Sequence, residues 1–421
     1  MNIRFSKCFA FILAILMLVL TACGKSSNNV STKPENVLNG SESLDGQTLK
    51  IGIFHESAAA NNRLQKQVMD LFAKKWNEEG TLFGASVEII EYDDTNNGAQ
   101  DTETAIKCAQ KLINSDHVQV IIPGALSNIT QATGAIINDA RVLDIGTGLS
   151  PTWMQQGWEY VYRSALCNDY QVPSVTTTMK TLNQKSVSIL YMNTDNCLTF
   201  RDSLKAECET SGINVVCEEM LNSDGTYITG GITGQVTSAI NAKPDCIFLT
   251  AMGNCFGTVI KQIRQSGYDG MIYIGQILST AEVESVGAEE VNGVIMCSPY
   301  VMYGKVDDCT DSFVKDALQQ FYNEYGEMPV DDQFYKVWDA MLIIENAVLA
   351  SGSINPTDLK NAIPSLKIDG CAGTMDFTTG SNECYFGARA WVYTGNGESG
   401  GPVHLEDWLK SDLAEKVIIT N

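Results

Sequence analysis

Histidine is scarce in this sequence, which has only His55, His117 and His404. Histidine is the usual acid–base group near neutral pH and a frequent metal ligand, so few catalytic or metal sites can be built here. No Walker sequence occurs, and the overlapping G-x-G-x-x-G and G-x-S-x-G at 395–401 lie in a polar Gly-rich turn near the C-terminus, not between a strand and a helix of the predicted alternation. The G-T-G at 146–148 lacks the third glycine. These absences argue against an enzyme, and we expect no cofactor.

Basic residues are in the minority. The chain has 28 Lys and Arg against 50 Asp and Glu, a formal net charge of −22, and two of the basic residues are Arg4 and Lys7 near the N-terminus. A surface this acidic repels phosphate groups. The composition therefore argues against nucleic acid or an anionic lipid surface as a partner.

Cysteines are numerous but lack metal-site spacing. The sequence contains 13, with no C-x-x-C and no histidine close to any of them, so we expect no metal site. Eleven lie after the N-terminal segment, and an odd number leaves at least one unpaired. Cys371 with Cys384, or Cys208 with Cys217, could bridge. The alternative is that the cysteines are buried free thiols, and we expect this for most of the eleven.

Long apolar runs are absent except at the N-terminus. Phe9–Leu20 follows basic residues and is too short for a typical membrane-spanning helix. The Leu-Thr-Ala that precedes Cys23 resembles the lipobox of bacterial lipoproteins, in which the cysteine is acylated. The alternative is an ordinary secretory signal with a chance cysteine. We expect a signal peptide over 1–22 and a flexible tether over 23–47, rich in Ser, Asn and Gly.

The rest of the chain alternates strands and helices. In the first part we predict strands at Leu49–Phe54, Ser86–Tyr92, Val118–Ile122 and Arg141–Ile145, and helices at Arg63–Glu78, Ala99–Asn114 and Gln131–Ala140. In the second part we predict strands at Ser186–Tyr191, Ile213–Cys217, Asp245–Thr250, Met271–Ile274 and Gly293–Cys297, and helices at Cys197–Ser211, Gly231–Asn241 and Cys255–Ser266. This alternation predicts an α/β fold with two doubly wound parallel-sheet lobes, and 421 residues suit two domains.

The last part departs from this alternation. Two long helices are predicted near Asp311–Tyr325 and Asp331–Ala350, with a short one around Pro356–Ile363. Thr374–Tyr393 is interpreted as two strands joined by Thr378–Asn382.

The stretch Val118–Ala140 is the strongest candidate for a binding site. A buried strand ends at Pro123, and Ser127 and Asn128 stand where a helix begins. Such a turn presents free backbone N–H groups and the positive end of the helix dipole, which suits a carboxylate or another small polar group. The alternative is that Ser127 or Asn128 only caps its own helix.

Several short motifs occur in a fixed order along the chain. They are Lys50-Ile51-Gly52-Ile53, Trp76-Asn77, Tyr92-Asp93-Asp94, Lys111-Leu112-Ile113, Val120–Ser127, Tyr162-Arg163, Asp169, Gln171, Tyr325-Gly326, Trp338-Asp339-Ala340 and Gly370–Phe377. In this order the chain resembles the extracytoplasmic solute-binding proteins of branched-chain amino acid ABC transporters, which have the type I periplasmic-binding-protein fold. The resemblance covers Leu49 to about Tyr393.

The resemblance implies two lobes joined by three crossovers, near Leu166, Pro299 and Thr374. Lobe one would comprise 48–166 plus 300–373, and lobe two 167–299 plus 374–421. The lobes would close on a small-molecule ligand by hinge motion and deliver it to an ABC permease and its ATPase. The resemblance also implies a monomer on the outer side of the membrane, attached only through its lipid.

Within this resemblance, two loops fall on the family's clamp for the ligand carboxylate. Ser127 or Asn128 falls on the serine that holds the carboxylate, and which of the two is left open. Thr147, Gly148 and Ser150 fall on the second loop, which completes the clamp.

The remaining ligand positions match the family less closely. Asp169 falls on an acidic residue that can face the ligand amine, although it could also be a solvated or hinge-capping carboxylate. Polar residues replace the family's aromatic and acidic side chains; they are Asn61, Asn196, Asn254 and Gln276. Because Gln276 is neutral, Asp169 or Glu56 must pair with a ligand ammonium, or the ligand is not an α-amino acid.

These substitutions indicate a ligand more polar than leucine. A tethered sensor of the same fold, reporting ligand to a receptor, is the alternative function. Asp93-Asp94 could be taken for an acid–base pair, but its place at a strand end before a glycine-containing loop favours a structural turn.

Overall fold

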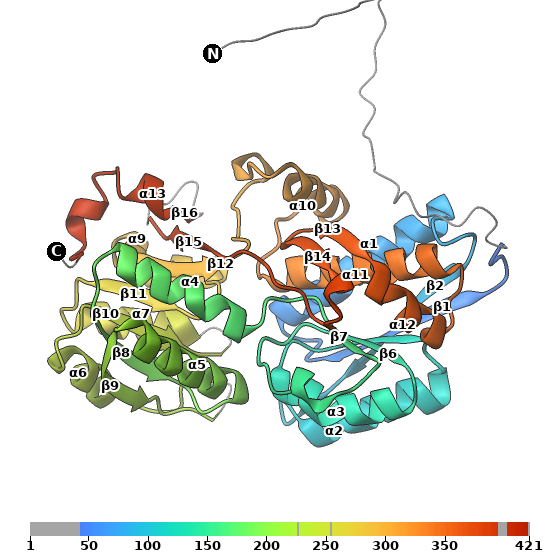
Figure 1. The fold of residues 1–421 in the computed structure, drawn as a ribbon, viewed down its shortest axis with the longest axis horizontal. Helices are drawn as coiled ribbons and strands as arrows, with labels where there is room; N and C mark the ends of the chain where they lie inside the picture. Colours follow the sequence, from blue (N-terminus) through green and yellow to red (C-terminus); the bar gives the residue numbers. More distant parts are fainter. Residues whose placement is uncertain (1–42, 225–226, 253–254, 395–401, 420–421) are drawn as a thin grey trace, which may run out of the picture. The chain divides into compact units, whose positions relative to one another are not determined.

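The computed structural model describes residues 43–224, 227–252, 255–394 and 402–419. The predicted signal peptide, Cys23, most of the predicted tether and Asn254 lie outside the described residues. Two large sheets organise the chain, each flanked by helices (Figure 1). The α/β alternation predicted from the sequence is therefore confirmed.

The first sheet is parallel throughout, in the order β2-β1-β5-β6-β7. Its strands are β1 (Thr48–His55), β2 (Ser86–Asp93), β5 (Val120–Pro123), β6 (Leu143–Gly146) and β7 (Val161–Arg163). A two-residue pair, β3 (Thr95–Asn96) and β4 (Ala99–Gln100), follows β2.

Helices cover both faces of the first sheet. The helices on one face are α1 (Ala60–Glu79) and α11 (Gln333–Ser351), and those on the other are α2 (Thr102–Lys111) and α3 (Ser127–Asp139). A π-helical turn (Leu112–Asp116) extends α2. Further helices are α10 (Ser312–Tyr325) and α12 (Pro356–Ala362). Because both faces are covered, the central strands β1, β5 and β6 are almost entirely buried.

The second sheet has the order β16-β15-β12-β11-β10-β8-β9. Its strands are β8 (Ser186–Tyr191), β9 (Asn214–Met220), β10 (Cys246–Thr250), β11 (Met271–Ile274), β12 (Val294–Ser298), β15 (Arg389–Val392) and β16 (Val403–His404). The first five are parallel, whereas β15 and β16 are antiparallel additions at the β12 edge. Its helices are α4 (Asn168–Thr181), α5 (Asp195–Ser211), α6 (Thr233–Asn241), α7 (Cys255–Gln265), α8 (Thr280–Val286), α9 (Ala288–Val291) and α13 (Leu405–Trp408).

The predicted tail hairpin is wrong, and so is the lobe boundary at 373/374. Residues Gly373–Asp376 form β14, which pairs with β13 (Lys367–Gly370) and not with β15. The Asp339 carboxylate holds the turn between β13 and β14 by accepting hydrogen bonds from the backbone N–H groups of Cys371 (2.6 Å) and Ala372 (3.0 Å).

The chain then stays beside the first sheet as far as Glu383, which forms a parallel bridge with Arg163. The third crossover therefore lies between Glu383 and β15. The last residues of the predicted tether also differ from the expectation. Leu44 is buried, and its N–H donates to the Phe83 carbonyl oxygen at 2.8 Å, so the packed body begins before β1.

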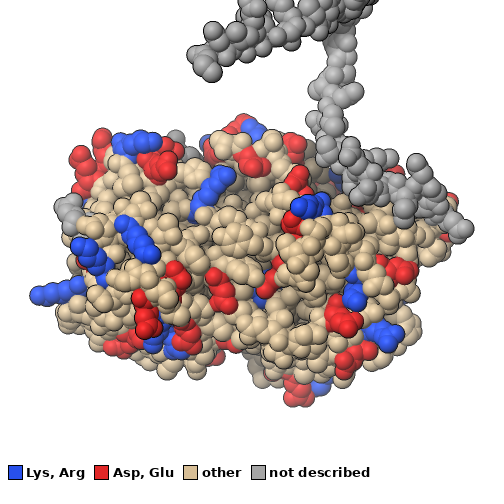
Figure 2. All heavy atoms as spheres, viewed as in Figure 1, with Lys and Arg blue, Asp and Glu red and all other residues tan. Residues whose placement is uncertain are grey.

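The thiols of the two cysteine pairs considered for bridging, Cys208 with Cys217 and Cys371 with Cys384, are free. Within the described residues no single helix is both long and apolar enough to cross a membrane. By length and composition α11 and the helical stretch Pro356–Ser365, bent by 96°, pass that test together. Acidic and basic side chains are interspersed over the face drawn in Figure 2.

Candidate functional site

The start of α3 turns toward the neighbouring loop and is not capped by a side chain of its own. Leu126 occupies the N-cap position, so no side chain there bonds the first N–H groups of the helix. Ser127 is buried, and its Oγ accepts a hydrogen bond from the backbone N–H of Ser150 at 3.1 Å. Asn128 is exposed. The helix start therefore keeps its free N–H groups and positive dipole end.

The loop after β6 packs tightly against this helix start. A Cβ atom on Gly148 would lie 2.7 Å from Ser127 Oγ, so only glycine allows the approach. The Thr147 side chain is fully buried, and its Oγ1 has no hydrogen-bond partner among the described residues. Ser150 Oγ lies 2.9 Å from Thr152 Oγ1. The two predicted loops thus meet at the start of α3, where Ser127 Oγ bonds the backbone of Ser150.

A buried arginine holds the loop in place. The Arg163 guanidinium donates to the carbonyl oxygens of Leu149 (3.1 Å) and Ser150 (2.5 Å) and lies 4.3 Å from the centre of the Trp153 ring. Its Nε also lies 3.4 Å from a carboxylate oxygen of Glu383. Arg163 thereby links the loop to the first and third crossover segments.

The second sheet contributes the start of α5 to the same place. Thr152 Oγ1 donates to the Asp195 carboxylate at 3.0 Å, and Thr199 Oγ1 lies 3.4 Å from Ser150 Oγ. These hydrogen bonds join a loop of the first sheet to a helix of the second. The two halves of the fold therefore meet directly at the Gly148–Ser150 loop.

A small cavity of about 20 Å³ lies beside these contacts. Its lining comes from the loop, the first two crossovers, lobe-two strand ends and α11: Leu149, Leu166, Gln171, Gly275, Gln276, Ile277, Met296, Ser298, Pro299, Tyr300, Asp332 and Lys336. This volume holds about one water molecule. A larger ligand requires the walls to move apart.

A comparison with known protein families matches most of the chain. The family described as periplasmic binding protein matches residues 51–398. The chain belongs to the periplasmic binding protein family. The resemblance drawn from the sequence motifs is thus confirmed at the level of the family. No curated protein matches the chain in sequence.

Solved structures show the same fold at low identity. The leucine-binding protein LivK from Thermotoga maritima has a TM-score of 0.71 and 18% identity, over 85% of this chain and 99% of that one. LivJ from Streptococcus pneumoniae, solved with isoleucine, has a TM-score of 0.71 and 20% identity, over 85% and 100%. A solute-binding protein from R. palustris, solved with 4-hydroxybenzoate, has a TM-score of 0.73 and 14% identity, over 85% and 96%.

Only some of the predicted ligand-binding residues lie close together. Ser127, Gly148 and Ser150 meet one another, and Gln276 lines the cavity. Asn196 is buried, and its Oδ1 accepts a hydrogen bond from Asn168 Nδ2 at 2.7 Å, within lobe two.

The predicted amine partners and the remaining position lie elsewhere. Asp169 is exposed on α4, and its carboxylate accepts a hydrogen bond from Ser203 Oγ at 2.5 Å. Glu56 is half-buried and does not line the cavity. Burial and the charge of Asp93 raise its pKa, while His55 lowers it. Asn61 falls in the first turn of α1.

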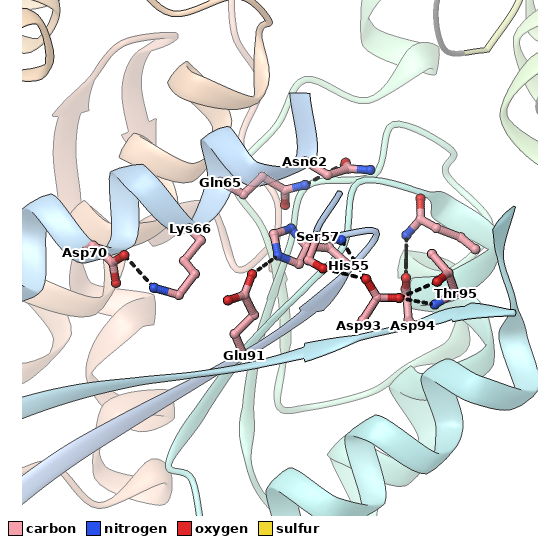
Figure 3. A network of polar contacts seen from close by, with 11 residues as sticks. His55, Ser57, Asn62, Gln65, Lys66, Asp70, Glu91, Asp93, Asp94 and Thr95 are labelled. Atoms are coloured by element: carbon pink, nitrogen blue, oxygen red, sulfur yellow. Dashed lines mark hydrogen bonds and ion pairs between the residues drawn. The ribbon is translucent and has the colours of Figure 1, made fainter. Parts of the chain in front are cut away.

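The Asp93-Asp94 pair closes a structural turn (Figure 3). Burial raises the pKa of Asp93, but hydrogen bonds from Ser57 and Thr95 outweigh it and lower that pKa to about 2. Asp94 is fully buried and accepts from Gln100 Nε2 at 3.0 and 3.2 Å, and burial raises its pKa to about 7. The side-chain hydrogen bonds to both carboxylates come from Ser57 in the loop after β1 and from Thr95 and Gln100 in the short pair β3 and β4, which agrees with the predicted turn.

Sequence reasoning missed the roles of Arg163, Asp195 and the Asp332–Lys336 pair. Arg163 appeared only as part of a motif, because a buried arginine cannot be told from an exposed one in a sequence. Asp332 and Lys336 are four residues apart on a predicted helix, which is also the spacing of ordinary surface ion pairs. Within the described residues no group of three or more His, Cys, Asp or Glu is arranged to hold a metal ion.

Proposed function

We propose that this chain is a lipid-anchored extracytoplasmic solute-binding protein. It captures a small polar ligand between its two lobes and delivers it to an ABC permease with its ATPase. The observation that carries the proposal is the meeting of the α3 start, the Gly148–Ser150 loop and the α5 start, which come from both halves of the fold. Membership of a binding-protein family supports binding and transfer over catalysis.

The α3 start is suited to the anionic or polar end of the ligand. Its free N–H groups and the positive end of its dipole favour a carboxylate, and the Ser127 and Ser150 hydroxyls lie beside it. The isoleucine of LivJ and the 4-hydroxybenzoate of the R. palustris protein both carry a carboxylate. We therefore expect a carboxylate in the ligand of this chain.

The rest of the ligand is expected to be more polar than leucine. The cavity wall includes the amides of Gln171 and Gln276 and the ion pair of Asp332 with Lys336. Gln171 Nε2 already donates to the carbonyl oxygens of Gly275 and Cys297, and Asp332 pairs with Lys336, but a purely aliphatic side chain would still take the remaining polar atoms of this wall out of water, which is unfavourable. Cys23 is proposed to carry the lipid, which would keep the binding lobes close to the permease.

A thermal-shift screen tests the proposal. The mature chain, made with Cys23→Ser to keep it soluble, is heated with amino acids, amides, short peptides and small carboxylates that include 4-hydroxybenzoate. A ligand that binds the folded state raises the melting temperature by mass action. Ser127→Ala should remove the shift, whereas the neighbouring Asn128→Ala should keep it. Shifts that survive Ser127→Ala, or no shift with any compound, would count against the site.

A further inference from the structure

An ion pair at the start of α11 lies in the wall of the cavity. Lys336 Nζ lies 2.8 Å from Asp332 Oδ1, and the two side chains are 4% and 13% exposed. Leu149 of the clamp loop and Gln276 of lobe two line the same cavity. Ser164 Oγ donates to the Lys336 carbonyl oxygen at 2.8 Å, which fixes this turn of α11 to the first crossover. The pair therefore faces the place where the ligand is expected.

Two acidic side chains and one basic side chain lie together at the start of α11. Asp331 precedes Asp332 and interacts electrostatically with both Asp332 and Lys336. Among the described residues of the cavity wall, Lys336 is the one basic side chain and Asp332 the one acidic side chain. Asp331 is a further acidic side chain next to the pair, outside the wall. If a cation entered the cavity, it would face Asp331 and Asp332 together with Lys336, so two positive groups would stand against two acidic side chains. A ligand anion at this point would instead meet two carboxylates and one lysine.

Other carboxylates near the cleft are held by hydrogen bonds to neighbouring side chains. Asp169 accepts from Ser203 on the exposed side of α4, and Asp195 accepts from Thr152. Gln276, at the family's acidic position, is a neutral amide that lines the same cavity as Asp332. A buried ammonium without an anionic partner is strongly unfavourable. Among the described residues that line the cavity, Asp332 alone supplies such a partner.

We infer that Asp332 binds an ammonium group of the ligand, with Lys336 as its counter-ion before the ligand enters. This inference rests on the proposed function. The ligand carboxylate lies at the α3 start, and the ammonium points toward α11. The anionic partner is thereby supplied by lobe one, in place of the acid that the family carries in lobe two.

The test compares each amino acid with the carboxylic acid that lacks its amino group. The amino acid with the largest thermal shift, and its des-amino analogue, are titrated into the wild-type protein by calorimetry. The wild type should prefer the amino acid by about tenfold or more, because only the amino acid has an ammonium group that can pair with the Asp332 carboxylate. Asp332→Asn should reduce that preference by about tenfold, whereas Asp169→Asn should keep it within about twofold.

Asp332→Asn leaves the buried Lys336 without its partner and can weaken folding, so Asp332→Asn/Lys336→Met serves as a second variant. It should also bind amino acid and analogue about equally. An unchanged preference in a folded variant overturns the inference and leaves the proposed function standing. If the wild type binds only carboxylic acids that lack an amino group, the inference is also overturned and the proposed function also stands. A wild-type protein that binds none of the screened compounds overturns both.

Discussion

Asp144 shows how one buried residue can contribute to the pH dependence of stability. It lies in the middle of β6, it is fully buried, and its two carboxylate oxygens have no hydrogen-bond partner among the described residues. Burial raises its pKa well above the usual value of 3.8. The protonated form is therefore the one that suits the folded protein.

We expect Asp144→Asn to remove part of the loss of stability with rising pH. The folded state binds the proton more tightly than the unfolded state, so stability falls as pH rises above about 4, by up to about 1.4 kcal/mol per pH unit until the folded-state pKa is passed. The variant should gain stability relative to the wild type between about pH 4.5 and 7.5 in urea unfolding. The exposed Asp139→Asn is the control, and equal pH slopes for wild type and Asp144→Asn would contradict the explanation.

Arg163 is a second residue whose effect reaches beyond its own strand. Lysine cannot donate to two carbonyl groups and stack on Trp153 at once, so Arg163→Lys should lower the free energy of unfolding by about 2–3 kcal/mol. Arg201→Lys is the matched control, because Arg201 pairs with Asp202, whose side chain is 61% exposed, and should change it by about 0.5 kcal/mol or less. Similar losses in the two variants would show that the Arg163 contacts do not hold the loop.

At the scale of elements, the strands were predictable because each is a short apolar run before a polar loop. The predicted Val118–Ile122 and Asp245–Thr250 match β5 (Val120–Pro123) and β10 (Cys246–Thr250) closely. Partners of the tail strands were not predictable in the same way. The pairing of β13 with β14 depends on Asp339, distant in sequence, which binds the turn between them.

Some parts of the candidate site could be predicted from the sequence, and others could not. The α3 start and the loop after β6 could be predicted, because both follow strands whose carboxyl ends meet at one edge of a parallel sheet. The Asp332–Lys336 pair could not, because its place depends on how α11 packs beside the crossovers. A helical pattern predicts which face is apolar, but it does not show which cavity the polar residues reach.

The close contact between the loop after β6 and α3 can be tested by adding one methyl group. Gly148→Ala places a Cβ atom 2.7 Å from Ser127 Oγ and 3.1 Å from Ser127 Cα, so the helix start must shift. We expect a loss of about 1–3 kcal/mol in unfolding free energy together with weaker ligand binding. Gly231→Ala, with no atom within 4 Å of the added Cβ, is the control. Unchanged binding by a folded Gly148→Ala protein would place the ligand elsewhere.

For the whole molecule, the contacts between the two halves bear on how fast a ligand enters and leaves. A cavity of about 20 Å³ is too small for an amino acid. We therefore expect the two halves to separate during binding and the Thr152–Asp195 hydrogen bond between them to break. We expect this bond both before and after binding and its absence only while the halves are apart. It should therefore slow association and dissociation alike and leave the equilibrium nearly unchanged.

Thr152→Val removes the donor of this bond and leaves Asp195, which is half-buried and can be solvated. A hydrogen bond to a charged group contributes about 1.5–3 kcal/mol, so both rates should rise about tenfold or more, while Kd stays within about twofold. Stopped-flow tryptophan fluorescence with the best amino acid measures the rates. Ser203→Ala, which removes a hydrogen bond to Asp169 within lobe two, should leave them unchanged. A higher Kd with an unchanged association rate would mean that the bond forms only after the ligand has bound.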